Sequence, residues 1–186
     1  MSALSLFNER GFEATTIDDI TERADVAKGT FFNYFPRKEA VVEYLAEEWM
    51  DGAEATAGDS GHPAIERLLT LYSGASRAYD ENPDLARMVM RTALERFCTP
   101  APGGAWQRFE GLVMRTIREG QERGELRRDV DPQEMYGVLG SCFLGSLIWW
   151  LGPRDNCPAR QYPLCDVVRH LQKMAIDGLR PAGGVA

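Results

Sequence analysis

Apolar residues recur every three or four positions along nearly the whole chain, which is the spacing of amphipathic α-helices. Ile17, Ile20 and Ala24 form one such stripe, and another runs through residues 164–175. No run of alternating β-branched and polar residues, which would indicate a strand, interrupts this pattern. The chain is therefore predicted to be all-α.

The first fifty residues are predicted to hold three short helices and to begin a fourth. Gly11 ends the first helix, because glycine adopts a positive φ without a steric penalty. Thr16 is a good N-cap for the second helix. The third begins at Lys28 and ends before Pro36, since proline has no backbone N–H. With a fourth helix over residues 38–51, these elements form an N-terminal domain of residues 1–51.

Small and polar residues fill positions 52–61, and we interpret them as a linker. Five longer helices follow, which places a second, helical domain at residues 52–186. Asp131 and Pro132 mark a strong helix start, since aspartate caps the helix and proline suits its first position. The expected helices cover residues 63–79, 83–97, 105–123, 131–151 and 163–179.

The most apolar stretch, residues 135–151, is interrupted by glycine and serine. It is also shorter than the roughly 20 apolar residues that a membrane span needs, so we expect a buried helix there. Residues 1–7 lack the basic start and the apolar core of a signal peptide. The protein is therefore expected to be cytoplasmic.

Net charge argues at first against nucleic-acid binding. The 186 residues carry a net charge of −7 and the pI is about 5.0, whereas DNA-binding domains are usually basic. The local distribution differs, because residues 26–38 hold three basic side chains and no acidic one. A small basic surface can therefore lie on an acidic protein.

The residues that usually carry chemistry are sparse. No C-x-x-C pair occurs, and we expect reduced, mostly buried thiols, with a thiol sensor as the alternative. His62 and His170 lie far from paired thiols, so neither a metal site nor a cofactor is predicted. Motifs of nucleophilic, phosphate-binding and zinc-protease sites are missing, and an enzyme is not expected. The four cysteines are Cys98, Cys142, Cys157 and Cys165.

The second and third helices are predicted to form a helix-turn-helix. In this motif the later of the two helices buries one side in the domain and presents the other side to DNA. Phe31 and Phe35, four residues apart, can bury together against Ile17 and Ile20. The opposite side of the helix is then free for base edges and phosphates.

Individual side chains on that side have distinct predicted contacts. Lys28 can reach a guanine or a phosphate, and Thr30 a base edge or a thymine methyl. Thr16, Tyr34 and Lys38 are placed for phosphates, although Tyr34 could also belong to the core of the domain. The predicted DNA-binding residues are Thr16, Lys28, Gly29, Thr30, Phe32, Asn33, Tyr34 and Lys38.

The stretch from Phe7 to Glu39 resembles the signature of the TetR/AcrR family of transcriptional regulators, and residues 120–132 resemble a join common in its C-terminal domain. The resemblance implies a homodimer, in most members a repressor, that a small ligand releases from operator DNA. The matching positions are Phe7, Gly11, Phe12, Thr15, Thr16, Ile17, Ile20, Ala24, Val26, Lys28, Gly29, Thr30, Tyr34, Phe35, Lys38 and Glu39.

Two departures from the family pattern favour an alternative, a helical adaptor or ligand-binding protein that has lost DNA binding. Phe32 stands where many members have a tyrosine, whose hydroxyl often meets a phosphate. The first helix is also shorter than is usual in the family. Either the start codon is misassigned, or the protein lacks part of that helix and its phosphate contacts.

The last two helices are the candidates for a four-helix dimer interface, since small residues allow close approach and apolar residues supply a face. A two-fold dimer would place two DNA-reading helices on one side of the duplex. The alternative is that these residues form domain core. The predicted interface residues are Gly137, Gly140, Ser141, Gly145, Leu164, Val168, Leu171 and Ala175.

A ligand pocket is expected among the first four helices of the second domain. Aromatic and methionine side chains there suit a flat or flexible apolar ligand. The alternative for each of these residues is again the domain core. The predicted lining is Tyr72, Met88, Trp106, Phe109, Val113, Phe143 and Leu147.

Overall fold

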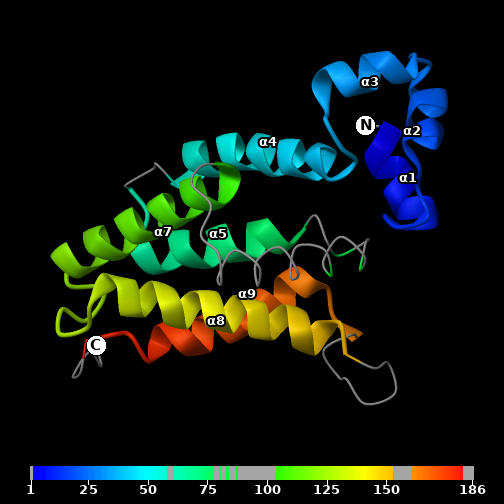
Figure 1. The fold of residues 1–186 in the computed structure, drawn as a ribbon. Coiled ribbons are helices and arrows are strands. Elements are labelled where there is room, and N and C mark those ends of the chain that lie inside the picture. Colours follow the sequence, from blue (N-terminus) through cyan, green and yellow to red (C-terminus); the bar gives the residue numbers. More distant parts are fainter. Residues whose placement is uncertain are drawn as a thin grey trace.

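The computed structural model describes residues 2–57, 61–77, 80, 83, 87, 104–152 and 161–181 of the 186. Over these ranges the regular elements are helices, which confirms the all-α prediction (Figure 1). Within the described ranges, none of the helices combines the length and the apolar character of a membrane span. The helices are α1 (Ser2–Arg10), α2 (Ile17–Ala24), α3 (Lys28–Tyr34), α4 (Glu39–Ala57), α5 (Ala64–Arg77), α7 (Gly104–Glu122), α8 (Pro132–Trp150) and α9 (Leu164–Asp177).

Local turn chemistry sets the ends of the short N-terminal helices. Gly11 adopts a φ of 85° and follows the last residue of α1, as predicted. Thr16 caps α2 and forms a capping box with Asp19, in which each side chain binds the backbone N–H of the other residue. Asp25 ends α2 in the left-handed region with a φ of 52°, which aspartate tolerates better than most residues.

The first three helices and the start of α4 enclose a small hydrophobic core. The rings of Phe31 and Phe35 lie with their centroids 5.5 Å apart, and both belong to the same cluster as Ile17 and Ile20. The prediction that these four residues pack together is therefore confirmed. The buried members of this core are Ala3, Leu6, Phe7, Phe12, Ile20, Phe31 and Val41.

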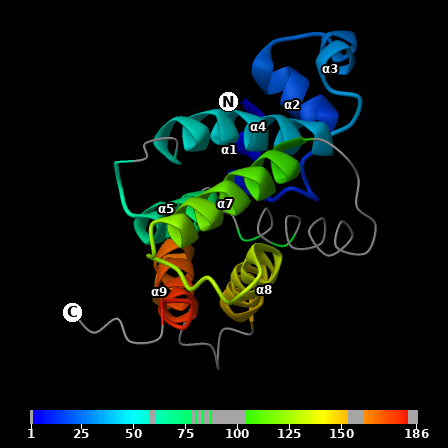
Figure 2. The same ribbon diagram turned by 90° about the vertical axis from the view of Figure 1, so that its left-hand side faces the viewer.

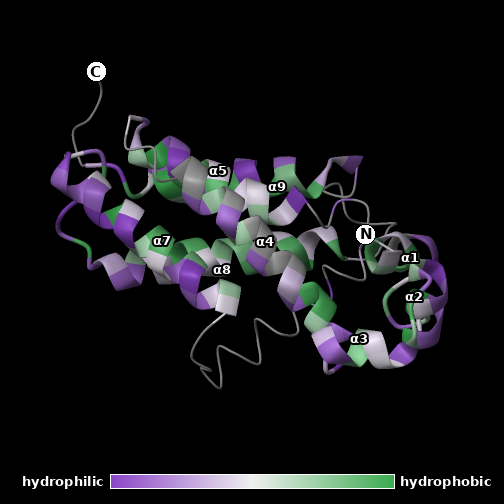
Figure 3. Ribbon diagram, turned by 90° about the horizontal axis from the view of Figure 1, so that it is seen from above, coloured by the Kyte–Doolittle hydropathy of each residue, from purple (hydrophilic) through white to green (hydrophobic). Residues whose placement is uncertain are grey.

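A second, larger core lies among the C-terminal half of α4 and helices α5, α7, α8 and α9. Helix α9 packs against both α5 and α8, and Figure 2 shows α8 and α9 on one side of α5 and α7. In Figure 3, hydrophobic and hydrophilic positions alternate along the helices, as expected for elements with one buried face.

Helix α4 joins the two cores without a break. We expected it to end near residue 51, but it continues to Ala57, so the predicted domain boundary and residues 52–57 of the predicted linker fall inside a helix (Figure 1). Val41 packs in the smaller core and Met50 in the larger one. The small residues that suggested a linker include alanines, which favour helix, and contacts with the larger domain decide between the two conformations.

One such contact is an arginine of α7 that binds a row of acids on α4. Arg108 pairs with Glu47, Asp51 and Glu54 at N–O distances of 2.6–3.0 Å. Its hydrogen bonds to Glu54, Asp51 and Glu47 raise the pKa of Arg108, and the guanidinium lowers the pKa of the Glu54 carboxyl. These ion pairs favour continuation of α4 beyond residue 51.

The two described cysteines are less buried than expected. Cys142 and Cys165 are free thiols with intermediate exposure, while Cys98 and Cys157 lie outside the described residues. Burial raises the pKa of both thiols, and at Cys165 the carboxylate of Asp80 raises it further. A raised pKa disfavours the reactive thiolate, so these environments do not favour a thiol sensor.

Candidate nucleic-acid interface

Helix α3 is held by one buried side and presents the other side to solvent. Phe31 is 5% exposed and anchors the helix in the smaller core. Lys28, Gly29, Thr30 and Asn33 are all exposed. This division of α3 into a buried and an exposed face is the one that the helix-turn-helix prediction requires.

Two aromatic residues also lie on the exposed side of α3. Tyr34 is 76% exposed, so the alternative that placed it in the core of the domain is wrong. Phe32 is 47% exposed and packs edge-on against Phe31, with ring centroids 5.6 Å apart. Val26, just before α3, is 42% exposed and was not among the predicted DNA-binding residues. The rings of Tyr34 and Phe32 can stack on or pack against DNA, which has apolar base and sugar surfaces.

Nothing among the described residues requires glycine at position 29. A Cβ built there would meet no heavy atom within 4 Å. At Gly120, by contrast, a Cβ would lie 2.8 Å from the Ala64 side chain and 2.9 Å from Leu126, so close packing requires a glycine. The bare backbone of Gly29 therefore leaves open space on the outer side of α3.

Two of the three basic side chains of residues 26–38 are paired with acids in the unbound protein. Lys28 binds Asp18 at 2.7 Å, and Arg37 binds Glu43 at 2.6 Å. Asp18 thus lies at the edge of the exposed face of α3. Because all four side chains are more than half exposed, these pairs contribute little and exchange easily for other partners, including phosphates.

The ammonium group of Lys38 is committed to the protein, in contrast to its predicted role at a phosphate. Its Nζ donates hydrogen bonds to the carbonyl oxygens of Phe12 and Thr15, at 2.6 and 2.9 Å. It also lies 4.3 Å from the ring centroid of Phe12. The charge therefore ties the start of α4 to the loop between α1 and α2, and only its third proton is left for another acceptor.

Thr16 also has its donors occupied. Its hydroxyl and its backbone N–H both donate to the carboxylate of Asp19, at 2.6 and 2.8 Å. The predicted phosphate contact through Thr16 would therefore require the capping box to open. The sequence predicted Thr16 as the N-cap of α2, but not the binding of its hydroxyl and N–H by the carboxylate of Asp19, three residues later.

The predicted pocket residues gather in the larger core around one tyrosine. The ring of Tyr72 on α5 lies 5.2 Å from that of Phe109 on α7 and 5.7 Å from that of Phe143 on α8, measured between centroids. Val113 and Leu147 are fully buried in the same cluster, and Trp106 is partly buried. Met88 lies outside the described residues.

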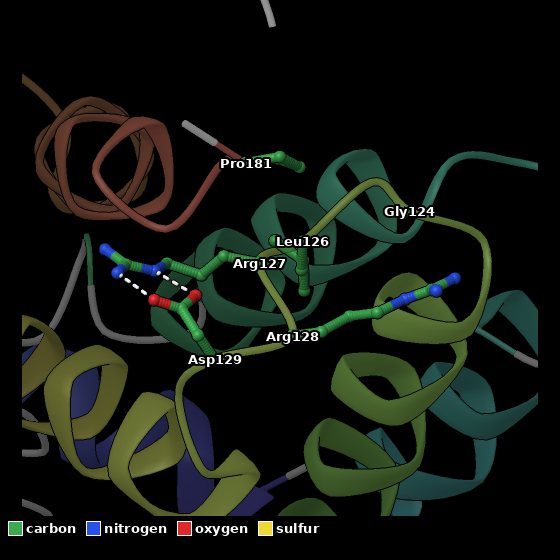
Figure 4. Close-up of a pocket in the computed structure, with 6 residues that line it drawn as sticks. All are labelled: Gly124, Leu126, Arg127, Arg128, Asp129 and Pro181. Carbon is green, nitrogen blue, oxygen red and sulfur yellow. Dashed lines mark hydrogen bonds and ion pairs between the residues drawn. The ribbon is translucent and has the colours of Figure 1, made fainter. Parts of the chain in front are cut away.

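A surface hollow lies elsewhere, between the loop that joins α7 to α8 and the residues after α9 (Figure 4). Its charges are satisfied within the chain. Arg127 pairs with Asp129 at 2.5 Å, and its hydrogen bonds lower the pKa of Asp129 to about 2. Arg128 donates to the carbonyls of Gln121 and Glu122 at the end of α7. The hollow is lined by Gly124, Leu126, Arg127, Arg128, Asp129 and Pro181, and it contains none of the predicted pocket residues.

Half of the predicted dimer interface faces the interior of the chain. Leu164 and Val168 are completely buried between α9 and its neighbours, which corrects the prediction that they face a partner. The reason is that α9 packs between α5 and α8, and its apolar stripe is used there. Leu171 and Ala175 are partly buried against the same core.

The predicted residues of α8 lie differently. Gly137, Ser141 and Gly145 are exposed and Gly140 is partly exposed, and no heavy atom lies within 4 Å of a Cβ built at any of the three glycines. Val138 and Ile148 are 48% and 56% exposed, and they lie at the two ends of a row on α8 that also contains Ser141 and Gly145. Neither was among the predicted interface residues, although apolar residues are spread over more than one side of α8, a pattern that indicates two covered faces.

Comparison with known proteins agrees with the helix-turn-helix geometry. The model of the family "Bacterial regulatory proteins, tetR family" matches residues 2–45, which include α1, α2, α3 and the start of α4. The transcriptional repressor DhaR of Mycobacterium sp. (strain GP1) is 26% identical over 171 residues, which cover 84% of this chain and 82% of that protein.

Solved structures have the same fold over the whole chain. A TetR-family repressor, FadR of Thermus thermophilus in complex with lauroyl-CoA, aligns with a TM-score of 0.64 and 25% identity, covering 100% of this chain and 95% of FadR. A regulator from Saccharomonospora viridis in complex with choline aligns with a TM-score of 0.66 and 22% identity, over 97% and 95% of the two chains. The chain belongs to the TetR family of bacterial regulatory proteins and is a DNA-binding transcriptional regulator.

Proposed function

We propose that the chain is a homodimeric repressor that binds operator DNA through α3 and releases it when a small molecule binds in the larger core. The observation that carries the DNA-binding part is the amphipathic α3, which buries Phe31 and exposes Lys28, Thr30 and Asn33. The repressors DhaR and FadR support the direction of regulation.

Domain organisation follows from the two cores. We propose that residues 1–51 hold the DNA-binding unit and that residues 52–186 hold the ligand-binding and dimerisation unit. Helix α4 crosses this boundary and is shared by both. Movement of α4 relative to α7 would therefore change the position of α3 in a dimer.

For the dimer, we propose that the exposed row of α8 (Val138, Ser141, Gly145 and Ile148) packs against the same row of a second copy. Its small residues permit close approach of the two helices, and the two apolar side chains lose water on contact. In such a dimer the two α3 helices would enter successive major grooves, on the order of 34–36 Å apart.

For the effector, we propose a small molecule of apolar or aromatic character bound next to Tyr72, Phe109 and Phe143. Tyr72 is buried, and its ring packs against those of Phe109 and Phe143, which supports this assignment. The lauroyl chain held by the related FadR is also apolar.

DNA binding is tested by a gel shift with the DNA upstream of the protein's own gene. We expect Lys28→Ala to weaken binding by about 1–3 kcal/mol at a preferred base pair, which is the usual value of a specific base contact. Wild-type binding should also weaken with salt, by roughly 0.9 logarithmic units per neutralised phosphate for each logarithmic unit of salt.

Lys173→Ala is the matched control. Lys173 is also a lysine paired with an aspartate, Asp177, and its side chain is 58% exposed against 55% for Lys28. It lies on α9, so its loss should leave DNA affinity unchanged. If the wild-type protein does not bind duplex DNA at low ionic strength, the adaptor alternative replaces the repressor.

A further inference from the structure

The hydroxyl of Tyr72 differs from the other buried hydroxyls of the described residues. Six buried threonine and serine side chains each donate to a backbone carbonyl three or four residues earlier in the chain. Tyr72 is 1% exposed, and its hydroxyl has no hydrogen-bond partner among the residues that the structure describes. The six residues are Thr15, Thr21, Ser73, Ser76, Thr116 and Ser146.

Two other buried polar atoms of the described residues lack a hydrogen-bond partner, but their side chains are held in place by a second polar atom. Arg67 lacks a partner at Nε but binds Glu119 through Nη1, and Gln172 lacks one at Oε1 but donates to the carbonyl of Leu139. Each of these side chains is thus anchored by another atom. Tyr72 has only one polar atom, and that atom is unused.

The phenol is placed where a ligand could replace a missing partner. Its ring is flanked by Phe109 from α7 and Phe143 from α8, so the hydroxyl lies among helices that meet in the core. A serine or threonine hydroxyl can turn back onto its own helix, but the ring of tyrosine carries the oxygen beyond that reach. A buried hydroxyl without a partner is unfavourable for the fold, and such groups often mark a function.

Within the part of the chain that the structure describes, no charged group acts on this hydroxyl. Arg67 is the one charged residue that is buried among the described residues, and Glu119 neutralises it. The ionisable groups that act on Tyr72 are Tyr136 and Cys142, both neutral when protonated. Burial first, and then these two groups, raise the pKa of Tyr72 well above 10, so the phenol keeps its proton.

We propose that Tyr72 is the polar anchor of the effector site and that the effector is an uncharged, mainly apolar molecule with one oxygen that accepts the tyrosine proton. This inference rests on the proposed function, in which a small molecule binds in the larger core. A ketone, ester or alcohol oxygen would satisfy the hydroxyl. Among the described residues around Tyr72, a carboxylate or an ammonium group would find no ion of opposite charge, and burying such a group unpaired costs far more than the hydrogen bond returns.

The test uses ligands of one size with different head groups. Wild-type and Tyr72→Phe proteins, as full chains, are titrated by calorimetry with 2-dodecanone, cyclododecanone, laurate and dodecylammonium. We expect a ketone to bind the wild-type protein at least about tenfold more tightly than either ion. Tyr72→Phe should lower the affinity for that ketone by about tenfold or more, which is the usual loss when a buried hydrogen bond is removed.

Thermal unfolding without ligand separates this role from a structural one. We expect Tyr72→Phe to melt at the same temperature as the wild-type protein or higher, because a hydroxyl without a partner is removed. Tyr162→Phe is the control, since Tyr162 is 61% exposed and its loss should change neither melting nor ketone affinity.

Four results would overturn the proposal. They are ketone affinity that Tyr72→Phe leaves unchanged, tighter binding of an ion than of either ketone, no saturable binding of a ketone, and a clearly lower melting temperature of Tyr72→Phe. The gel shift with the upstream DNA distinguishes this failure from that of the proposed function. A protein that binds DNA but no ketone remains a regulator with another effector chemistry.

Discussion

Several polar side chains of the N-terminal helices could either bind DNA or stabilise the fold. The partners of each side chain within the protein distinguish these two roles. Lys28 and Arg37 bind exposed carboxylates, which phosphate can replace. Lys38 binds carbonyls of its own chain. Basic residues that are close in sequence therefore differ in how available their charge is for DNA.

Replacement of Lys38 by methionine tests this difference. We expect Lys38→Met to lower the free energy of unfolding by about 1.5–3 kcal/mol, because two hydrogen bonds from a charged donor are lost. Urea denaturation measures the change. If Lys38 mainly holds a phosphate, stability would instead stay nearly constant and the salt dependence of DNA binding would fall by about 0.9. Lys173→Met, at an exposed pair, should do neither.

The open space at Gly29 leads to a prediction in which stability and function move in opposite directions. Gly29→Ala should raise the free energy of unfolding by about 0.5–1 kcal/mol, because alanine restricts the unfolded chain and favours helix. The same methyl group projects from the exposed side of α3, and we expect it to weaken DNA binding. Gly111→Ala is the control, because Gly111 on α7 is equally open. Unchanged DNA affinity of Gly29→Ala would place the duplex away from this backbone.

At the level of single helices, the start of α2 depends on a carboxylate. Hydrogen bonds from the hydroxyl of Thr16 and then from its backbone N–H lower the pKa of Asp19 below 3.8, with a smaller effect from Arg10. A carboxyl whose pKa is lower in the folded protein stabilises the fold above its unfolded pKa. It loses that contribution as the pH falls through the folded pKa.

Asp19→Asn should therefore lower the melting temperature at neutral pH, and the difference from the wild type should shrink as the pH falls through 3.8 and below. Melting curves between neutral and strongly acidic pH measure this. Asp129→Asn provides a comparison on the far side of the molecule, because its carboxyl has a pKa of about 2. Its contribution should decline as the pH falls below 3.8 and be lost as the pH falls through about 2. A difference at Asp19 that does not depend on pH would contradict the role of its charge.

Helix α8 differs from its neighbours because it is apolar on two sides. Met135, Leu139 and Leu147 face the larger core, whereas Val138 and Ile148 are about half exposed. The adjacent Trp149 and Trp150 follow the same division, at 45% and 5% exposure. A helix with an apolar outer face is typical of a surface that another protein covers.

In the complete regulator, the outer face of α8 would set the separation of the two α3 helices. We expect Ile148→Glu to convert a dimer into a monomer, since two buried glutamates would face each other, and to reduce DNA affinity sharply. Sedimentation and gel shifts measure both effects. Gln133→Glu, on an exposed position of the same helix, should change neither. A stable dimer of Ile148→Glu would move the interface to another surface.

Much of the fold could be predicted from residues that are near one another in the chain. Gly11, the Thr16 cap and the Asp131–Pro132 start depend on contacts within a few residues, and all three lie where they were expected. The pairing of Phe31 with Phe35 is equally local. For this reason the helix-turn-helix and its exposed face could be read from the pattern.

The rest depends on partners that are far apart in sequence. A stripe on a helix indicates that the helix packs but not against what, so Leu164 and Val168 could be predicted to be covered and still be assigned to the wrong neighbour. Helix α4 continues past residue 51 because Arg108, more than fifty residues away, binds Glu54. Lys38 likewise meets Phe12 and Thr15 only after folding. Periodicity and caps act over one or two turns of helix, whereas the choice of packing partner and ion pair is made in three dimensions.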